Sequence, residues 1–148
     1  MATTLNSPTQ RRLLLPLLLA LSLVLPATVQ AQVLVIANPG ISLTAISKAE
    51  LHDVFTGVST SLKGTAQVMP VLLREGNVHS AFLSLYIGKS DSGFRAGWRS
   101  ILFSGQGTMP RTLDCDADIV AFVERTPGAI GYISSESPHK GVRVLAVR

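Results

Sequence analysis

The sequence predicts an α/β fold in which one mixed sheet is flanked by helices. Continuous apolar runs such as VLVIA at Val33–Ala37 are typical of strands buried on both faces. These runs alternate with helical patterns along the chain, as in an α/β sandwich. Residues 32–148 are enough for one hydrophobic core and too few for two lobes of similar size. We therefore expect a single domain over 32–148.

Residues 1–31 have the pattern of a secretory signal peptide. Arg11 and Arg12 precede a 13-residue apolar run, Leu13–Leu25. A membrane-spanning helix needs about 20 apolar residues, so this run is short for an anchor. Val29 and Ala31 occupy the −3 and −1 positions for a signal peptidase. The pattern predicts export to the periplasm with cleavage after Ala31.

Charge and cysteine content narrow the function classes. The whole chain carries a formal charge of +4, but two of its basic residues lie in the leader. The remaining excess of basic residues is too small to indicate a nucleic-acid partner. Cys115 is the only cysteine, so an internal disulfide is excluded.

The first helix has the clearest local signal in the chain. Ser47 and Glu50 form a capping box, and Ile46 and Leu51 are spaced as a hydrophobic staple. The helix is expected to run through Phe55, with Gly57 at the position after its C-cap.

The next strand and helix meet at a polar junction. Gln67–Leu73 reads as a strand that tolerates Pro70 only near an edge or a bulge. After Arg74, Glu75 and Gly76 we expect Asn77 to be the N-cap of a second helix. Its apolar residues at helical spacing are Ala81, Phe82, Leu85 and Tyr86.

The rest of the chain predicts two more helices and two strands. A helix follows Ser90 or Asp91, and its Phe94, Trp98, Ile101 and Leu102 are expected to form one core-facing side. Ser104–Pro110 reads as a flexible connector. The remaining elements are a helix over Asp114–Arg125 and strands at Ala129–Ser134 and Val142–Val147.

Several kinds of chemistry have no support. Asp114, Asp116 and Asp118 resemble the start of a calcium loop, but Ile119 and Arg125 stand where the loop needs glycine and glutamate. The three histidines, His52, His79 and His139, lack zinc-site spacing. No nucleophile elbow or complete phosphate-binding glycine loop occurs. We expect no enzyme activity, no metal and no cofactor.

The junction from Arg74 to Ser80 is the candidate site. A buried strand ends and a helix begins there, so the backbone N–H groups of Val78, His79 and Ser80 would point toward solvent beside the Arg74 guanidinium. Such an arrangement suits an anion. In the alternative interpretation, Asn77 merely caps the helix and Arg74 is solvated, which is the commoner role for such residues. The local sequence leaves both open.

The order of these segments resembles a known family. LTAISKAELHDVFTG, then MPVLLREG before a helix, then TPGAIGYI at Thr126–Ile133 are similar to the phosphate-binding proteins of ABC transporters. Those proteins have the type 2 periplasmic binding-protein fold. The resemblance covers residues 33–146 and implies one lobe of that fold, because the stretch that builds most of the first lobe is absent between Asn38 and Leu43.

The resemblance also implies an oxyanion site. In the family, an arginine is followed by a Ser-Gly-Thr run that binds phosphate. Here Arg74 matches the arginine, but Asn77, Val78 and His79 occupy the run, and Ser80 is a substitute hydroxyl. The implied ligand-binding residues are Arg74, Gly76, Asn77, Val78, His79 and Ser80. Because His79 is expected at the helix N-terminus, its protonation would favour a bound anion. Oxyanion binding would then strengthen as the pH falls through the range in which histidine titrates.

Two functions follow from these observations. The first is an exported solute-binding-like domain that binds phosphate or a similar oxyanion weakly, as part of, or derived from, a phosphate-uptake ABC transporter. Its partner would be the transporter permease or another envelope protein. The alternative is a ligand-free interaction module that docks on an envelope or membrane partner.

We expect the exported protein to begin at Gln32, because signal peptidase cleaves after the small residues at −3 and −1. N-terminal sequencing of the exported form checks this. A first residue of Met1 would contradict it, and an Ala31→Arg variant should accumulate uncleaved.

Overall fold

The computed structural model describes residues 32–63 and 67–148. The predicted signal peptide lies outside these residues. Within them, six strands form one sheet in the order β2-β6-β1-β5-β3-β4. The strands are β1 (Val33–Ala37), β2 (Ala45–Ile46), β3 (Met69–Leu73), β4 (Arg111–Leu113), β5 (Ala129–Ser134) and β6 (Arg143–Val147).

The sheet is mixed, as expected. β1 runs antiparallel to both of its neighbours, β5 and β6. β2 is parallel to β6, and β3 is parallel to β4 and β5. Because β3, β4 and β5 run in the same direction, their carboxyl ends share one edge of the sheet. Ligands of open α/β sheets bind at such an edge.

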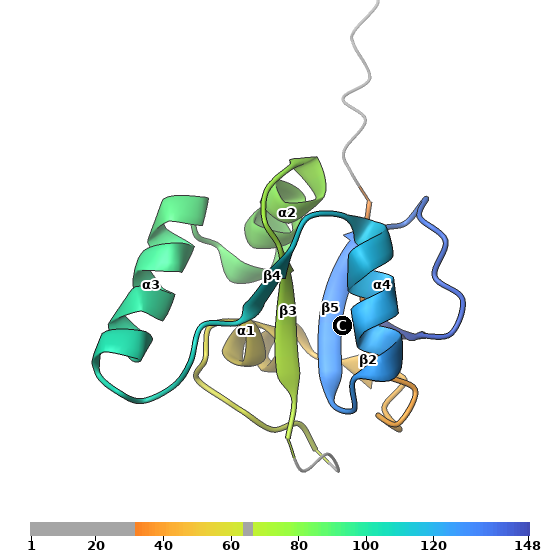
Figure 1. Ribbon diagram of the computed structural model, residues 1–148, viewed down its shortest axis with the longest axis horizontal. Coiled ribbons are helices and arrows are strands. Elements are labelled where there is room, and N and C mark those ends of the chain that lie inside the picture. The colour runs from red at the N-terminus through yellow and green to blue at the C-terminus, as the bar shows by residue number, and fades with distance from the viewer. Residues whose placement is uncertain (1–31, 64–66) are drawn as a thin grey trace, which may run out of the picture.

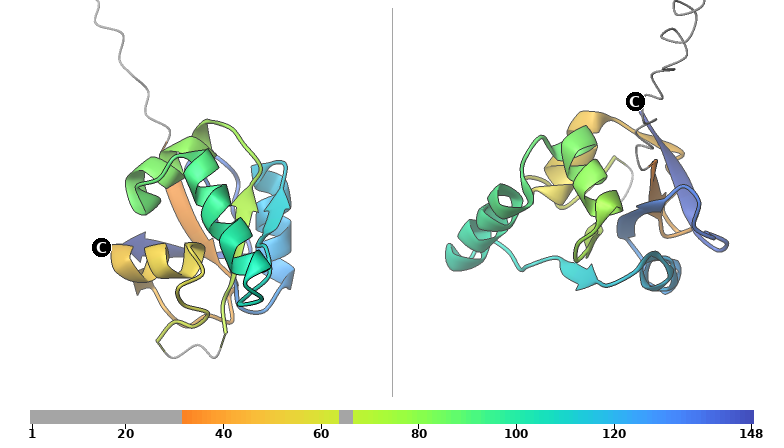
Figure 2. Two further views of the ribbon diagram at one scale, coloured as in Figure 1. Left: turned by 90° about the vertical axis from the view of Figure 1, so that its left-hand side faces the viewer. Right: turned by 90° about the horizontal axis from the view of Figure 1, so that it is seen from above.

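Helices cover both faces of the sheet (Figures 1 and 2). The helical elements are α1 (Lys48–Phe55), α2 (Asn77–Phe82), the π-helical turn η3 (Leu83–Ile87), α3 (Asp91–Phe103) and α4 (Asp116–Arg125). α4 packs on one face, where Gly131 leaves room for Ile119 and Val123. α1 and α2 cover the other face, and α3 lies outside them.

Aromatic side chains fill the core between the sheet and the α1–α2 layer. Tyr132 of β5 is fully buried, and its ring is parallel to that of Phe82, with centroids 3.8 Å apart. Phe55 of α1 contacts both rings, at 4.8 Å from Phe82 and 5.8 Å from Tyr132. Trp98 of α3 donates from its indole Nε1 to the Phe55 carbonyl at 2.9 Å. Burial of these rings is a major source of stability.

The strongest sequence signals are confirmed. Ser47 and Glu50 form the capping box at the start of α1. Gly57 follows the C-cap with a φ of 78°, a conformation that favours glycine. β3 pairs with β4 only from Val71 onward, so Pro70 faces no β4 partner, consistent with its lack of an N–H donor.

One expectation about the elements was wrong, and two short strands were not predicted. Gly76, with a φ of 106°, is the N-cap of α2, and Asn77 is the first helical residue. A Gly at this point can adopt the positive φ of the turn, which Asn adopts less readily. The short strands β2 and β4 were not predicted, because two or three residues are too few to show alternation.

The predicted apolar side of α3 is confirmed only in part. Phe94 and Trp98 are 2% and 6% exposed, whereas Leu102 is 44% exposed. Leu102, on the last turn of α3, therefore faces solvent although its spacing matches that of the buried residues. Ile101 is partly buried against the core.

We expect Trp98→Ala to lower the free energy of unfolding by about 3–5 kcal/mol, the usual cost of truncating a large buried aromatic. Leu102→Ala is the matched control and should change it by no more than about 0.5 kcal/mol, because Leu102 is exposed. Urea unfolding of the two variants checks both. Equal losses would show that the last turn of α3 is packed.

Candidate functional site

Arg74 lies at the carboxyl edge of the sheet, directly after β3. Leu73 is in register with Leu113 of β4, so the chain leaves both parallel strands at the same level. Asp114 therefore lies beside Arg74, and Arg74 Nε donates to Asp114 Oδ1 at 2.5 Å. This hydrogen bond raises the pKa of Arg74. The Arg74 and Asp114 side chains are 58% and 72% exposed, so the pair is accessible to a ligand.

The N-terminus of α2 supplies backbone donors next to this pair. The first helical hydrogen bond runs from the Ser80 N–H to the Gly76 carbonyl at 3.0 Å. The N–H groups of Asn77, Val78 and His79 precede it, and no side chain of the described residues caps them. Because the cap is Gly76, the orphan amides begin one residue earlier than predicted and do not include that of Ser80.

The His79 side chain points into the protein. His79 is 2% exposed. Its Nδ1 lies 2.5 Å from the Tyr132 hydroxyl, and its Nε2 lies 2.8 Å from Asp91 Oδ1. The expectation that the His79 side chain faces the anion site is therefore wrong, and only its backbone N–H lies at the helix N-terminus. The imidazole is a small polar ring that fits beside Phe94 and Tyr132.

The hydrogen bonds assign the protons of this buried group. The Tyr132 hydroxyl accepts from the Leu73 N–H at 3.2 Å, so its own proton is available for His79 Nδ1. Nε2–H then donates to Asp91. Burial raises the pKa of Tyr132, and the hydrogen bond from Arg95 lowers the pKa of Asp91. Tyr132 is therefore a neutral donor and Asp91 a charged acceptor at neutral pH.

Arg95 connects this group to the site. Its Nε is 2.9 Å from both carboxylate oxygens of Asp91, four residues earlier on α3. Its Nη2 donates to the Arg74 carbonyl at 2.5 Å. The loop that carries Arg74 is thus held by Tyr132 through the Leu73 N–H on one side and by Arg95 on the other.

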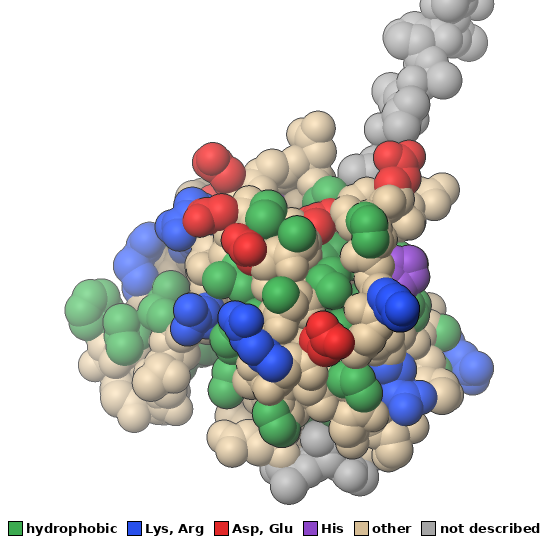
Figure 3. Space-filling model, turned by 45° about the vertical axis from the view of Figure 1, so that its right-hand side comes forward, with side chains coloured by type: hydrophobic (Ala, Val, Ile, Leu, Met, Phe, Trp, Pro, Cys, Tyr) green, Lys and Arg blue, Asp and Glu red, His purple; other side chains and the backbone are tan. Residues whose placement is uncertain are grey.

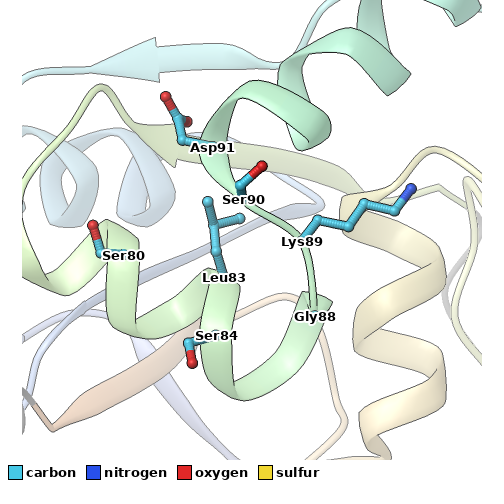
Figure 4. A pocket seen from close by; sticks show the side chains of 7 residues that line it. All are labelled: Ser80, Leu83, Ser84, Gly88, Lys89, Ser90 and Asp91. Atoms are coloured by element: carbon cyan, nitrogen blue, oxygen red, sulfur yellow. The ribbon is translucent and has the colours of Figure 1, made fainter.

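The Ser80 side chain lines a hollow that does not include Arg74. This hollow, of about 510 Å³, lies between α2–η3 and the start of α3. Figure 4 shows Ser80, Ser84, Ser90 and Asp91 around it, with the Lys89 side chain pointing away from Ser80. The Ser90 hydroxyl is engaged by the Gly93 N–H as the α3 cap. The structure therefore brings together Arg74 and the amides of Asn77, Val78 and His79, but not the Ser80 side chain.

Three residues position the site although no sequence pattern indicated this role for them: Asp114, Arg95 and Tyr132. The sequence predicted that Asp114 begins a helix, because the three residues of β4 before it are too few to show a strand pattern. Had β4 been placed parallel to β3, the register alone would have put Asp114 next to Arg74. Arg95 has a local partner in Asp91, four residues earlier, but its contact with the Arg74 carbonyl spans 21 residues. The partners of Tyr132, His79 and Leu73, lie 53 and 59 residues away, so no local pattern shows either contact.

The described residues contain no cluster of three His, Cys, Asp or Glu side chains that could hold a metal ion. Asp116 instead accepts from the Ser134 N–H at 2.9 Å and from the Ser137 hydroxyl at 2.6 Å, which anchors the loop after β5.

Among the described helices, none is long and apolar enough to cross a membrane.

Several solved protein structures have a fold similar to that of this chain. No protein-family model and no curated protein sequence matches the chain. The fold is similar to that of a protein from Clostridium perfringens assigned as a phosphate ABC transporter substrate-binding protein and solved with bound phosphate. That match has a TM-score of 0.62 and 20% identity, and it covers 79% of this chain and 45% of the other.

Two further structures give the same result. PstS from Borrelia burgdorferi matches with a TM-score of 0.61 and 18% identity over 80% of this chain and 47% of PstS. An ABC-type phosphate transport receptor from Vibrio cholerae matches with a TM-score of 0.54 and 13% identity. This match covers 79% of this chain and 46% of the receptor. The chain thus has the fold of about half of a phosphate ABC transporter substrate-binding protein, and the predicted resemblance and fold class are confirmed.

We expect Tyr132→Phe to lower the free energy of unfolding by about 1–3 kcal/mol, because it leaves the buried Leu73 N–H and His79 Nδ1 without a partner. Tyr86→Phe is the matched control, since the Tyr86 hydroxyl has no hydrogen bond to a described residue, and its change should stay within about 0.5 kcal/mol. Thermal unfolding of both variants measures the difference. Equal stabilities would contradict the assigned hydrogen bonds.

Proposed function

We propose that this chain is an exported, periplasmic solute-binding-like domain that binds phosphate or a similar oxyanion weakly. It acts as part of, or is derived from, a phosphate-uptake ABC transporter, with a permease or another envelope protein as its partner. The observation that carries this proposal is the position of Arg74. An arginine follows β3 at the ligand-binding edge of a fold shared with phosphate-binding proteins.

The donors at this edge suit a tetrahedral anion. The Arg74 guanidinium is planar and presents its N–H groups as a fork, which matches two oxygens of a phosphate. The uncapped amides of Asn77, Val78 and His79 add backbone donors at the positive end of α2. The helical segment continues through η3 to Ile87, so its dipole extends beyond the six residues of α2.

Three features make the affinity low. Asp114 already occupies one side of the Arg74 guanidinium and repels an anion. Glu75 adds a second carboxylate on the exposed loop. The site is open to water, which screens its charges. We therefore place the dissociation constant for phosphate at about 1 mM or weaker, the range of a few weak contacts.

The interaction-module alternative has support of its own. Phe103 at the end of α3 is 83% exposed, and Leu102 beside it is 44% exposed. Val58, after α1, is 74% exposed. Large apolar side chains grouped on a surface mark sites of protein contact. In this alternative the Arg74–Asp114 pair is structural, and the end of α3 contacts the partner.

We expect Arg74→Ala to abolish measurable phosphate binding at every pH, because it removes the exposed guanidinium that the proposal assigns to the anion. Arg99→Ala, at an exposed position on α3 that lies outside the site, should bind as the parent does. Calorimetric titration with phosphate, sulfate and acetate measures this. Unchanged binding by Arg74→Ala would favour the interaction-module alternative.

Asp114→Asn should bind phosphate about two- to fivefold more tightly than the parent, because the guanidinium loses a competing carboxylate. This substitution separates the two functions. If Arg74 and Asp114 form only a structural pair, phosphate affinity stays the same and only stability changes. The same titration with parallel urea unfolding distinguishes these results.

A further inference from the structure

A second cleft lies away from the Arg74 edge. It has a volume of about 720 Å³ and is bounded by α3, the connector before β4, the start of β3 and the end of α4. Figure 3 shows a recess at the lower left, between the part of the surface built by α3 and the body of the molecule. Met69 at the start of β3 lines this cleft, whereas Arg74 follows the end of β3. The cleft and the proposed oxyanion site therefore lie at opposite ends of the strand.

The walls of the cleft are largely apolar and firmly held. The Trp98 indole is fixed by its hydrogen bond to the Phe55 carbonyl. Gly57 packs so closely that an added Cβ would lie 2.7 Å from Ile101 Cδ1 and 2.9 Å from Trp98. Met69 and Met109, which also line the cleft, are 45% and 40% exposed. A preformed cleft of this size with exposed apolar side chains is typical of small-molecule sites.

Among the described residues that line the cleft, Arg111 is the only charged one. Its guanidinium carbon lies 5.1 Å from the centre of the Phe122 ring. Among the described residues, no carboxylate lies within ion-pair distance of Arg111. Arg74 and Arg95, by contrast, pair with Asp114 and Asp91. The cleft thus offers a single positive charge, oriented by an aromatic ring, beside apolar walls.

We propose that this cleft binds a small amphipathic carboxylate. The hydrocarbon or aromatic body of the ligand lies against Trp98, Met69 and Met109, and its carboxylate pairs with the Arg111 guanidinium. An arginine can pair with a carboxylate through two parallel hydrogen bonds, and its guanidinium loses little hydration when it does so. Both properties favour binding of a carboxylate beside the Phe122 ring. This inference is independent of the proposed oxyanion site, since the two share no residue.

The test uses three probes with the same alkyl chain: octanoate, octanol and octylamine. Trp98 is the only tryptophan in the chain and lines the cleft, so its fluorescence reports occupancy directly. We expect saturable changes with octanoate, weaker ones with octanol and none with octylamine. Equal responses to octanoate and octylamine, or no saturable response to any probe, would overturn the proposal.

Two variants locate the site. Arg111→Gln should weaken octanoate binding about tenfold, the loss expected for a charge-assisted hydrogen bond, and leave octanol binding unchanged. Arg99→Gln is the matched control and should bind octanoate as the parent does. Met109→Asp places a negative charge on a partly exposed wall and should abolish octanoate binding with normal thermal unfolding. Octanoate binding that survives both Arg111→Gln and Met109→Asp refutes the assignment of the carboxylate site to this cleft. Phosphate binding by the same variants should equal that of the parent, because the oxyanion site shares no residue with the cleft.

Discussion

The hydroxyl of Tyr132 is the polar contact on which the arrangement of the domain depends. Its ring is fully buried against Phe82 and Phe55, so the hydroxyl has no access to solvent and must find partners inside the protein. It finds them in the Leu73 N–H of the neighbouring strand and in the imidazole of His79 on α2. These two contacts fix how α2 lies on the sheet at the place where β3 ends.

The same hydrogen bonds continue outward to the surface. His79 donates to Asp91 at the start of α3, and Asp91 accepts from Arg95, which also donates to the Arg74 carbonyl. The backbone that presents Arg74 is therefore held by side chains from β5, α2 and α3. This explains why His79 is polar although it is buried. An apolar residue at His79 would leave both the Tyr132 hydroxyl proton and one Asp91 contact without a partner.

Much of the fold is predictable from local patterns, and most of the site is not. The capping box at Ser47, the apolar run of β1 and the breaks at Pro127 and Gly128 each depend on residues close together in sequence. The role of His79 depends on Tyr132, 53 residues away, so no local pattern shows whether its side chain faces solvent or core. The exposure of Leu102 depends in the same way on the tertiary packing of α3, which its helical spacing does not show. The strand pattern at Gln67–Leu73 correctly placed Arg74 directly after β3, but the pairing of Arg74 with Asp114 required the register of β4.

β4 shows how a very short strand determines the chemistry at both of its ends. Its three residues pair in parallel with Val71, Leu72 and Leu73. The residue that follows β4 is Asp114, and the parallel register brings its carboxylate to Arg74 and partly neutralises the oxyanion edge. The residue that begins β4 is Arg111, which the same register places beside Val71 and over Phe122, where no described carboxylate approaches. Strand register, more than the residue type, therefore decides which of these two arginines, Arg74 or Arg111, is matched by a carboxylate of the protein itself. The one that is not so matched retains its full capacity to pair with a carboxylate from outside.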